Sequence, residues 1–351
     1  MSKKVLMKGN EAIAEAAVRA GCKLYFGYPI TPQSEIPEYM SRRLPKIEGG
    51  AYIQAETEVS AINMVYGAAS TGKRAMTSSS SPGVSLMMEG ISYLAGAELP
   101  CLLVNIMRGG PGLGNINPEQ ADYFQAVKGG GHGSYHLIVL APSSVQEMAD
   151  LTVEGFNLAD KYRNPVMVVA EGNLGQMMEP VEFKESYPQT VDHSAWALTG
   201  AKGRPGHVVT SIYLAAEDME KYIQKLYRKY DLIEKTEVRY EEFMMDDAEV
   251  VLVAYGIVSR VVRNVVEALR EEKIKAGMIR PITLWPYPKD IIRKRADQAK
   301  FFLTCEMSTG QMVEDVLLSV NGKKPVYFYG RFGGMVPTPA EIVAEVKKYY
   351  K

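Results

Sequence analysis

The sequence predicts an α/β protein with two layered units, each built from strands that alternate with helices. The chain has 351 residues, which is enough for two or three compact domains. Over about the first 180 residues, short apolar runs alternate with helical stretches, a pattern that indicates parallel β-α-β units. The same alternation begins again near Glu249, after a charged stretch. We therefore expect a first domain over residues 1–190, a helical connector over 191–245 and a second domain over 246–351.

The first unit is expected to begin with a helix over residues 10–21, with Asn10 as N-cap and Gly21 as the stop. Small side chains in a second helix, over residues 56–72, would let it pack closely against a flat ligand or another backbone. The remaining elements follow from apolar runs and turn residues. We expect strands over 23–27, 51–54, 74–78, 100–107, 137–140 and 165–170, and helices over 83–97 and 143–162.

The stretch after residue 180 is rich in charged side chains and is expected to carry an exposed helix over 215–243, either a solvated connector or a docking surface for another subunit. The second unit then starts with a strand over 249–256 and a helix from Ser259, which suits an N-cap. Its other elements repeat the alternation. We expect strands over 275–286, 300–307 and 326–330, and helices over 288–298 and 310–320.

Composition excludes several classes of protein. The formal net charge of −1 provides no field for nucleic acid or an anionic membrane. There is no apolar run as long as a membrane span, and acidic residues lie where a signal peptide would need its apolar core, so we expect a cytoplasmic protein. The three cysteines, Cys22, Cys101 and Cys305, are far apart. They cannot supply the four ligands of an iron–sulfur cluster or a structural zinc, so no metal is expected on this chain.

The turn over residues 27–35 follows the first predicted strand, where ligands of open α/β sheets bind. Two prolines stiffen this turn and preset the hydroxyl of Thr31. The alternative is that Thr31 is only the N-cap of the next helix, with Pro32 at its first position.

Two glutamates, Glu56 and Glu58, lie where a strand ends and a helix begins. An acid in the first helical turn ordinarily compensates the helix dipole. The functional alternative requires a carboxylate in an apolar pocket against an aromatic nitrogen base, because burial would raise its pKa and let it exchange a proton there.

Two further loops follow strands. Residues 78–83, four serines followed by Pro82 and Gly83, could present backbone N–H groups to an anion, or form a plain serine turn. Arg108 opens a glycine-rich loop, 108–114, and its guanidinium would suit a planar carboxylate; the alternative is an arginine in a mobile loop. Two more glycine stretches are weaker indications of a functional site. Residues 129–133 include His132, which we expect to be a surface histidine, and residues 330–334 are expected to form a turn or an interface element.

These motifs, in this order, resemble the alpha subunit of 2-oxoacid:ferredoxin oxidoreductases. The similar segments are GYPITPQSE (27–35), QAETEVSAINMVYGAASTGKRAMTSSSSPG (54–83), LPCLLVNIMRGGPGLG (99–114) and EVVLVAYGIVSR (249–260), so the resemblance covers almost the whole chain. The nearest type is the one that acts on 2-ketoisovalerate, and the 2-oxoglutarate type is a neighbour. The resemblance implies the pyrimidine-type domain of a thiamine diphosphate-binding fold, followed by a transketolase C-terminal-like domain that is mainly structural.

The resemblance also implies roles for particular residues. Glu56, where the Q-x-E match ends, would hydrogen-bond N1′ of the aminopyrimidine and so promote loss of the thiazolium C2 proton, with Glu58 as a rival. Thr31 and Arg108 would contact the 2-oxoacid, Arg108 by pairing with its carboxylate. The cofactor would also contact Ser81, Pro82 and Gly83, although Ser81 stands where similar loops have a glycine.

What the sequence lacks indicates a split enzyme. The diphosphate–magnesium half of a thiamine site carries a G-D-G motif and a later Asn, and nothing here fits it. We therefore expect a beta subunit that supplies the diphosphate site, Mg²⁺ and a 4Fe-4S cluster, and gamma and delta subunits for coenzyme A and ferredoxin. The expected reaction converts a 2-oxoacid and CoA to acyl-CoA and CO2 while reducing ferredoxin. An alpha–alpha homodimer, a 2-oxoglutarate-specific enzyme and a non-catalytic scaffold subunit remain alternatives.

Overall fold

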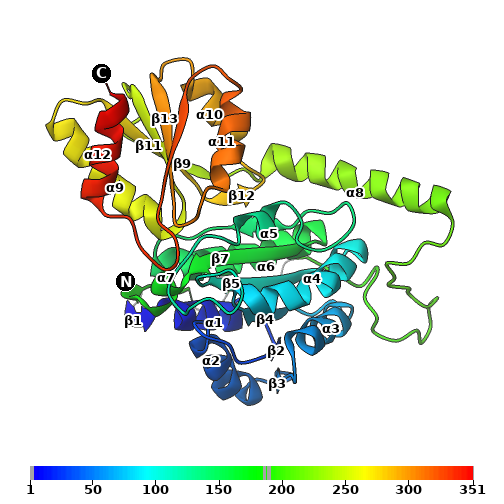
Figure 1. The fold of residues 1–351 in the computed structure, drawn as a ribbon. Coiled ribbons are helices and arrows are strands. Elements are labelled where there is room, and N and C mark those ends of the chain that lie inside the picture. Colours follow the sequence, from blue (N-terminus) through cyan, green and yellow to red (C-terminus); the bar gives the residue numbers. More distant parts are fainter. Residues whose placement is uncertain (1–3, 185–186, 188–190, 351) are drawn as a thin grey trace.

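The computed structural model describes residues 4–184, 187 and 191–350. Two layered units lie one above the other, and a long helix projects to one side between them (Figure 1). The larger unit holds a seven-stranded sheet and a small two-stranded one, and the smaller unit holds a five-stranded sheet. The prediction of two α/β units is confirmed, whereas the domain limits at 190 and 245 stay a prediction.

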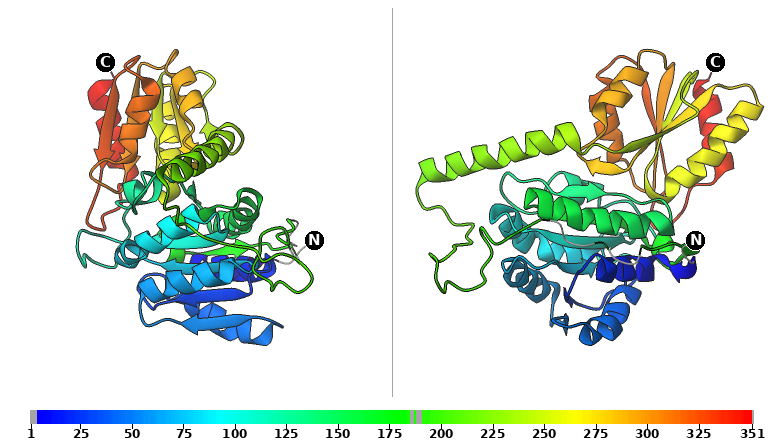
Figure 2. Two further views of the ribbon diagram at one scale, coloured as in Figure 1. Left: turned by 90° about the vertical axis from the view of Figure 1, so that its right-hand side faces the viewer. Right: turned by 180° about the vertical axis from the view of Figure 1, so that it is seen from behind.

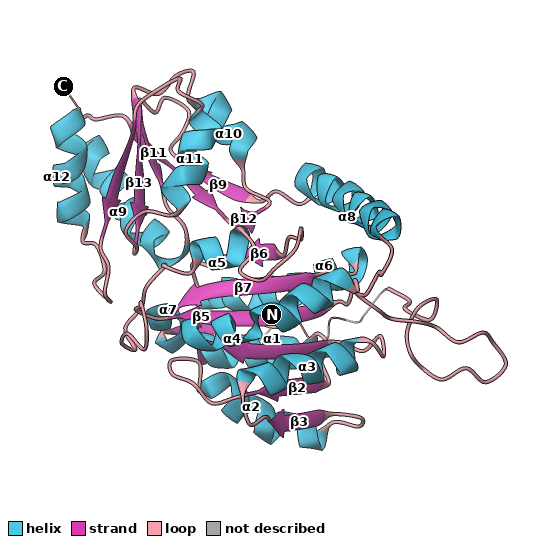
Figure 3. Cartoon of the chain, turned by 45° about the vertical axis from the view of Figure 1, so that its right-hand side comes forward, coloured by secondary structure: helices cyan, strands magenta, loops and turns pink. Residues whose placement is uncertain are grey.

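The seven-stranded sheet has the order β12-β6-β7-β5-β4-β2-β3, with every pair parallel except β12 and β6. Figure 3 shows these strands stacked from β7 down to β3. Central strands are buried along their whole length, which explains their continuous apolar sequences. The bounds are β2 Leu24–Gly27, β3 Ala51–Gln54, β4 Ala75–Ser79, β5 Cys101–Met107, β6 Ile138–Leu140, β7 Pro165–Glu171 and β12 Thr283–Trp285.

Helices cover both faces of this sheet: α4 lies in front of it in Figure 1 and α6 in front of it when seen from behind in Figure 2. Their starts follow capping chemistry, since Thr57 accepts a hydrogen bond from Ser60 N at the start of α3 and Ser144 accepts one from Glu147 N at the start of α6. The bounds are α1 Gly9–Arg19, α2 Glu35–Arg43, η1 Leu44–Lys46, α3 Glu58–Ala69, α4 Ser81–Gly96, α5 Tyr123–Val127, α6 Val145–Tyr162 and α7 Gly172–Gln176, and the antiparallel pair is β1 Val5–Lys8 with β8 Met178–Val181.

The second sheet has the order β14-β13-β10-β11-β9, parallel except for the edge strand β9. Its helices show the strong amphipathic spacing of surface helices, with Val262, Val265 and Val266 of α9 fully buried. The bounds are β9 Tyr240–Phe243, β10 Val250–Val253, α9 Gly256–Glu271, β11 Ala276–Pro281, α10 Lys289–Arg295, β13 Phe301–Glu306, α11 Met312–Val320, β14 Val326–Gly330 and α12 Pro339–Tyr349.

The connector carries α8, Ala216–Thr236, which projects from the body together with the loop before it (Figures 1 and 2). Its inner face is attached through Tyr222, whose hydroxyl donates to Gly96 O at 2.6 Å, and through Lys229, whose Nζ lies 3.3 Å from Glu98 Oε1. The helix predicted over 215–243 is therefore confirmed only in part, because residues 240–243 pair as strand β9 with the second sheet.

Several local predictions are wrong, and packing explains each. Asn10 does not cap α1; it is buried, and its amide donates to Pro32 O and to Glu35 Oε2, both at 2.8 Å. Thr31 and Pro32 do not begin a helix, because α2 starts only at Glu35. Ser259 lies inside α9, where its hydroxyl donates a hydrogen bond to Gly256 O at 2.7 Å.

The strand predicted over residues 275–286 is two strands that belong to different sheets. After β11 ends at Pro281, the chain crosses to the larger unit, where β12 pairs with β6. The second half of the sequence thus contributes an edge strand to the first sheet. Among the helices in the described part of the chain, none is both long enough and apolar enough to cross a bilayer.

Candidate functional site

The loops singled out in the sequence meet at one edge of the larger sheet. Strands β2, β4 and β5 are parallel neighbours, so their carboxyl ends lie side by side. Thr31 follows β2, the serine run ends β4, and Arg108 follows β5 directly. Gln33, fully buried behind the Thr31 turn, anchors it to the serine run, because its Oε1 accepts a hydrogen bond from Ser78 Oγ at 2.5 Å.

Arg108 is held at this edge by backbone contacts. Its Nη1 donates to Thr31 O at 2.9 Å and its Nη2 to Leu113 O at 3.2 Å, while its buried Nε has no partner in the described residues. No carboxylate of the described residues lies within ion-pair distance of this guanidinium. Arg108 therefore keeps an uncompensated positive charge and a free donor, as a site for an anionic ligand requires.

Arg108 faces a cavity of about 650 Å³. Ser81 stands at its base, since its hydroxyl accepts a hydrogen bond from Arg108 N at 3.0 Å. The cavity takes residues from the serine run, from the arginine loop and from the second unit. They are Ser81, Pro82, Ser85, Arg108, Gly109, Gly110, Pro111, Gly112, Leu113, Glu119, Ala121, Asp122, Thr309 and Gln311.

Thr31 is exposed and lines an adjoining cavity of about 400 Å³, together with Pro32, Glu35, Asn117 and other residues. The loop that follows Arg108 separates the two cavities and returns to pair with it as an isolated bridge at Pro118. The structure thus brings Thr31 and Arg108 together through the Thr31 carbonyl rather than through its hydroxyl.

The two glutamates differ sharply in their surroundings. Glu56 is exposed, and its closest contact is a hydrogen bond of 3.5 Å from Ser60 Oγ. Glu58 is only 5% exposed, at the first position of α3, and its carboxylate faces the start of α4. Of the two acids, only Glu58 is buried, which is one part of what the functional alternative requires.

The structure allows a direct test of whether thiamine diphosphate fits here. A Cβ added to Gly83 would lie 2.1 Å from Ser79 Oγ and 2.4 Å from Glu58 Oε1, so the absence of a side chain lets the start of α4 pack directly against these two groups. The hydroxyls of Ser79 and Ser80 are buried without partners in the described residues. A buried acid and unpaired hydroxyls at this sheet edge are polar partners of the kind that an aminopyrimidine ring requires.

Sequence reasoning missed the contribution of the second unit to this site. Thr309 and Gln311, which precede α11, line the Arg108 cavity, and so does Asp122, on the loop before α5. Burial raises the pKa of the Asp122 carboxyl, against hydrogen bonds from Ser81 and Asn105. No sequence motif marks these residues, because only the docking of the two units places them at the cavity.

That docking depends on buried polar contacts. Gln120 Nε2 donates to Glu171 and to Tyr255 O, while its Oε1 accepts from Met307 N at 3.0 Å. Glu171 Oε2 in turn accepts from Ile257 N at the start of α9, and burial raises the pKa of Glu171 to about 7.

A second polar contact between the units joins the glycine-rich loops 108–114 and 330–334. Glu119 accepts hydrogen bonds from Gly110 N at 2.7 Å and from Gly333 N at 2.9 Å. The 330–334 stretch is therefore an interface element, as one of the two sequence interpretations had it.

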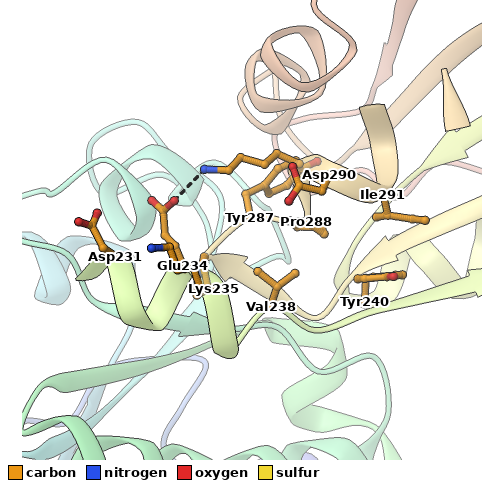
Figure 4. A pocket seen from close by; sticks show the side chains of 11 residues that line it. Asp231, Glu234, Lys235, Val238, Tyr240, Tyr287, Pro288, Asp290 and Ile291 are labelled. Atoms are coloured by element: carbon orange, nitrogen blue, oxygen red, sulfur yellow. Dashed lines mark hydrogen bonds and ion pairs between the residues drawn. The ribbon is translucent and has the colours of Figure 1, made fainter. Parts of the chain in front are cut away.

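Other candidate positions carry less chemistry. His132 is exposed, with its ring edge-on to Tyr93, which agrees with a surface histidine. A cavity of about 510 Å³ lies between the end of α8 and the start of α10 (Figure 4). Its Lys289 and Glu234 pair at 2.7 Å, and the other charged side chains of its lining, Asp231, Lys235 and Asp290, are of mixed sign. The three cysteines are buried thiols, and the described residues contain no cluster of metal ligands.

Comparisons with known proteins identify the family of this chain. A family model described as pyruvate flavodoxin/ferredoxin oxidoreductase, thiamine diphosphate-binding, matches residues 15–256, and one described as pyruvate:ferredoxin oxidoreductase core domain II matches residues 248–342. The chain is 52% identical to the ketoisovalerate oxidoreductase subunit VorB of Methanothermobacter thermautotrophicus, over 98% of this chain and 97% of that protein. It is 37% identical to the 2-oxoglutarate synthase subunit KorA of Methanocaldococcus jannaschii, over 96% and 97%.

Among solved structures, the 2-oxoglutarate:ferredoxin oxidoreductase from Magnetococcus marinus, with 2-oxoglutarate, coenzyme A and succinyl-CoA bound, matches with a TM-score of 0.86 and 29% identity. The match covers 99% of this chain but 65% of that longer chain. An inactive split-gene transketolase tetramer shares the fold alone, with a TM-score of 0.61 and 14% identity. Since the first family model spans more than half of the sequence and the relatives match nearly end to end, this chain is a member of the 2-oxoacid:ferredoxin oxidoreductase family.

Proposed function

We propose that this chain is the subunit that binds the thiamine pyrimidine in a ferredoxin-linked oxidoreductase, and that the complex oxidises 2-ketoisovalerate with CoA to an acyl-CoA and CO2. The observation that carries the proposal is the pairing of two features at one sheet edge. The buried Glu58 carboxylate packs against Gly83 at the start of α4, and the uncompensated Arg108 guanidinium faces the neighbouring cavity. The 52% identity to a ketoisovalerate oxidoreductase subunit supports the choice of substrate.

The sequence match proposes Glu56 for the contact with the aminopyrimidine, and we propose its rival Glu58 as the better candidate because it is the acid that this chain itself buries. A carboxylate hydrogen-bonded to N1′ of the aminopyrimidine must be shielded from water, because water would compete for the same proton. Glu58 is buried against α4, whereas Glu56 is exposed. When bound, thiamine diphosphate supplies the group that accepts the electrons of the bond broken in decarboxylation.

The other residues that the sequence match singled out surround these two groups. Arg108 would bind the substrate carboxylate through its free Nε, and Thr31 would contact the substrate after a shift of its side chain toward that cavity. Ser81 and Pro82 would lie between substrate and cofactor, since they line the Arg108 cavity at the start of α4. Gly83 would let the ring approach the helix backbone.

Partner subunits would complete the site. A beta subunit would bring the diphosphate and Mg²⁺ site and a 4Fe-4S cluster, and gamma and delta subunits would serve CoA and ferredoxin. The outer faces of α3 and α4 offer a surface beside Glu58, where Val59 and Leu86 are 43% and 54% exposed. The same surface could join two alpha chains, which would give the homodimer as an alternative assembly.

The test is purification of the native complex from anaerobically prepared extract through this chain, followed by 2-oxoacid-dependent viologen reduction with CoA. We expect partners with iron–sulfur clusters and faster turnover of 2-ketoisovalerate than of 2-oxoglutarate or pyruvate. Preference for 2-oxoglutarate would instead favour the activity named for the relatives at 37% identity. A complex in which no partner binds thiamine diphosphate would contradict a cofactor site shared between this chain and a beta subunit. This chain would then have only the role of a scaffold.

A further inference from the structure

Asp122 belongs to a short hydrogen-bonded chain that ends at Arg108. Its Oδ2 accepts from Asn105 Nδ2 at 2.9 Å, and the Ser81 hydroxyl forms a second hydrogen bond with its carboxylate. Ser81 Oγ in turn accepts from Arg108 N at 3.0 Å. The Ser81 hydroxyl has one proton and two acceptors within reach, the Asp122 carboxylate and Arg108 O at 3.3 Å, so an ionised Asp122 competes for this proton and leaves a lone pair of Ser81 for Arg108 N.

The second unit helps to hold the backbone around Asp122. Gln311 Nε2 donates to Ala121 O at 2.7 Å, and Gln311 Oε1 accepts from Phe124 N at 2.8 Å. The Gln311 side chain thus forms hydrogen bonds with the backbone on both sides of Asp122. Because Gln311 also lines the cavity, the hold on Asp122 and the wall of the site are parts of one contact between the units.

We propose that Asp122 is a positioning residue for the 2-oxoacid, which acts through Ser81 to orient the end of β5 that carries Arg108, and that Gln311 of the second unit keeps it in place. The inference rests on the proposed role of Arg108 in binding the substrate carboxylate. It gives the second unit a part in substrate binding, beyond the structural role that the sequence resemblance implied for it.

The proposal makes substrate binding depend on the ionisation of Asp122. The carboxylate form accepts from Asn105 and Ser81 more strongly than the neutral acid does, and burial raises the pKa of this group above its ordinary value. The other groups that face it are Glu119, which also raises its pKa, Arg108 across the cavity, and Tyr255 of the second unit. As pH falls, protonation of Asp122 should release Ser81 and weaken binding.

The experiment compares variants in the assembled complex by steady-state kinetics with 2-ketoisovalerate over a range of pH. For Asp122→Asn we expect the KM for the 2-oxoacid to rise about tenfold, the effect of losing one charge-assisted hydrogen bond, with kcat within about threefold. The wild-type rise of KM toward low pH should be absent in this variant. Ser81→Ala should raise KM similarly, and the double variant should be no worse than either single one.

The matched control is Asp150→Asn, because burial also raises the pKa of Asp150, which lies on α6 and does not line the cavity. It should leave KM and its pH profile unchanged. If Asp122→Asn does not assemble, Ser81→Ala must by itself raise KM and flatten the pH profile. An unchanged KM in Asp122→Asn, or additive effects in the double variant, would overturn the inference.

Arg108→Met separates the failure of this inference from failure of the proposed function. If it raises KM while Asp122→Asn does not, only the positioning role is lost. If Arg108→Met leaves KM unchanged, the carboxylate-binding role itself is wrong, and the inference fails with it.

Discussion

Two regions of the molecule contain buried polar groups: the carboxyl-end edge of the larger sheet with Ser79, Ser80 and Arg108, here called the rim, and the contact between the two units around Gln120 and Glu171, here called the junction. The two regions differ in whether these groups have hydrogen-bond partners within the chain. At the junction, Gln120 and Glu171 have their donors and acceptors paired across the interface. At the rim, Ser79 Oγ, Ser80 Oγ and Arg108 Nε are buried without partners in the described residues. Two adjoining regions of one fold therefore differ in whether the chain satisfies its own polar groups.

The difference separates stability from function. An unpaired buried polar group costs about 1–3 kcal/mol, so a chain keeps several together only where a ligand or partner will satisfy them. The paired groups of the junction instead hold the units in register. Substitutions at the rim should therefore affect activity, and substitutions at the junction should affect folding.

The largest expected effect is at the rim. Glu58→Gln should lower turnover of the assembled complex by about 100-fold or more, because the carboxylate that exchanges a proton with the cofactor is lost. The free energy of unfolding of the isolated chain should hardly change. Steady-state viologen reduction and chemical denaturation measure the two quantities.

Glu56→Gln is the matched control for that experiment, with the same chemical change at an exposed site two residues away. Its activity should stay within about twofold of wild type, as is usual for surface substitutions. Equal losses in both variants, or a larger loss for Glu56→Gln, would contradict the assignment of Glu58.

The next effect is at the junction. Gln120→Ala should lower the free energy of unfolding by about 1–3 kcal/mol, because it leaves Met307 N unpaired and removes one of the hydrogen bonds that the Glu171 carboxylate accepts. Denaturant unfolding of the chain checks this value. Gln224→Ala, on the exposed side of α8, is the control and should change stability by less than about 0.5 kcal/mol.

A pH dependence should also come from the junction. Burial raises the pKa of Glu171 from 4.5 to about 7, so the folded state holds a proton that the unfolded state has released. The stability contributed by this group is present at low pH and should fall by about 1.4 kcal/mol per unit as pH rises between those values. The difference in unfolding free energy between wild type and Glu171→Gln, measured across that range, should show this slope. A flat difference would mean that Glu171 is ionised throughout.

The smallest effect on stability should come from removing an unpaired group of the rim. Ser79→Ala deletes a buried hydroxyl that has no partner, so the unfolding free energy should change by less than about 0.5 kcal/mol or even increase. The same variant should bind thiamine diphosphate less tightly in the assembled complex, as cofactor content after gel filtration would reveal. A loss of stability without a loss of cofactor would remove the contrast between rim and junction.

The sequence predicted most elements of the fold because apolar periodicity and strand length are local properties. The strands over 51–54 and 326–330 were predicted to the residue, and the loops with Thr31, Ser81 and Arg108 were placed at strand ends, where the structure has them. Predictions failed where a local signal competed with a distant partner. Asn10 looks like a helix cap, yet its amide is used by Pro32 and Glu35.

The choice between Glu56 and Glu58 shows the same limit at the site. Both acids stand at the start of one helix, and spacing in the sequence does not distinguish them. Burial distinguishes them, since α4 covers Glu58 and leaves Glu56 to solvent.

The sequence by itself determined the alternation of strands and helices, the family resemblance and the three loops that meet at the sheet edge. Only the tertiary structure decided that the chain crosses between sheets at Ile282, that Glu58 is the buried acid, and that Gln311 holds Asp122 beside Arg108. The physical reason is that periodicity and turn chemistry act over a few residues. Burial and the pairing of polar groups depend on side chains that lie far apart in the sequence and meet only when the two units dock.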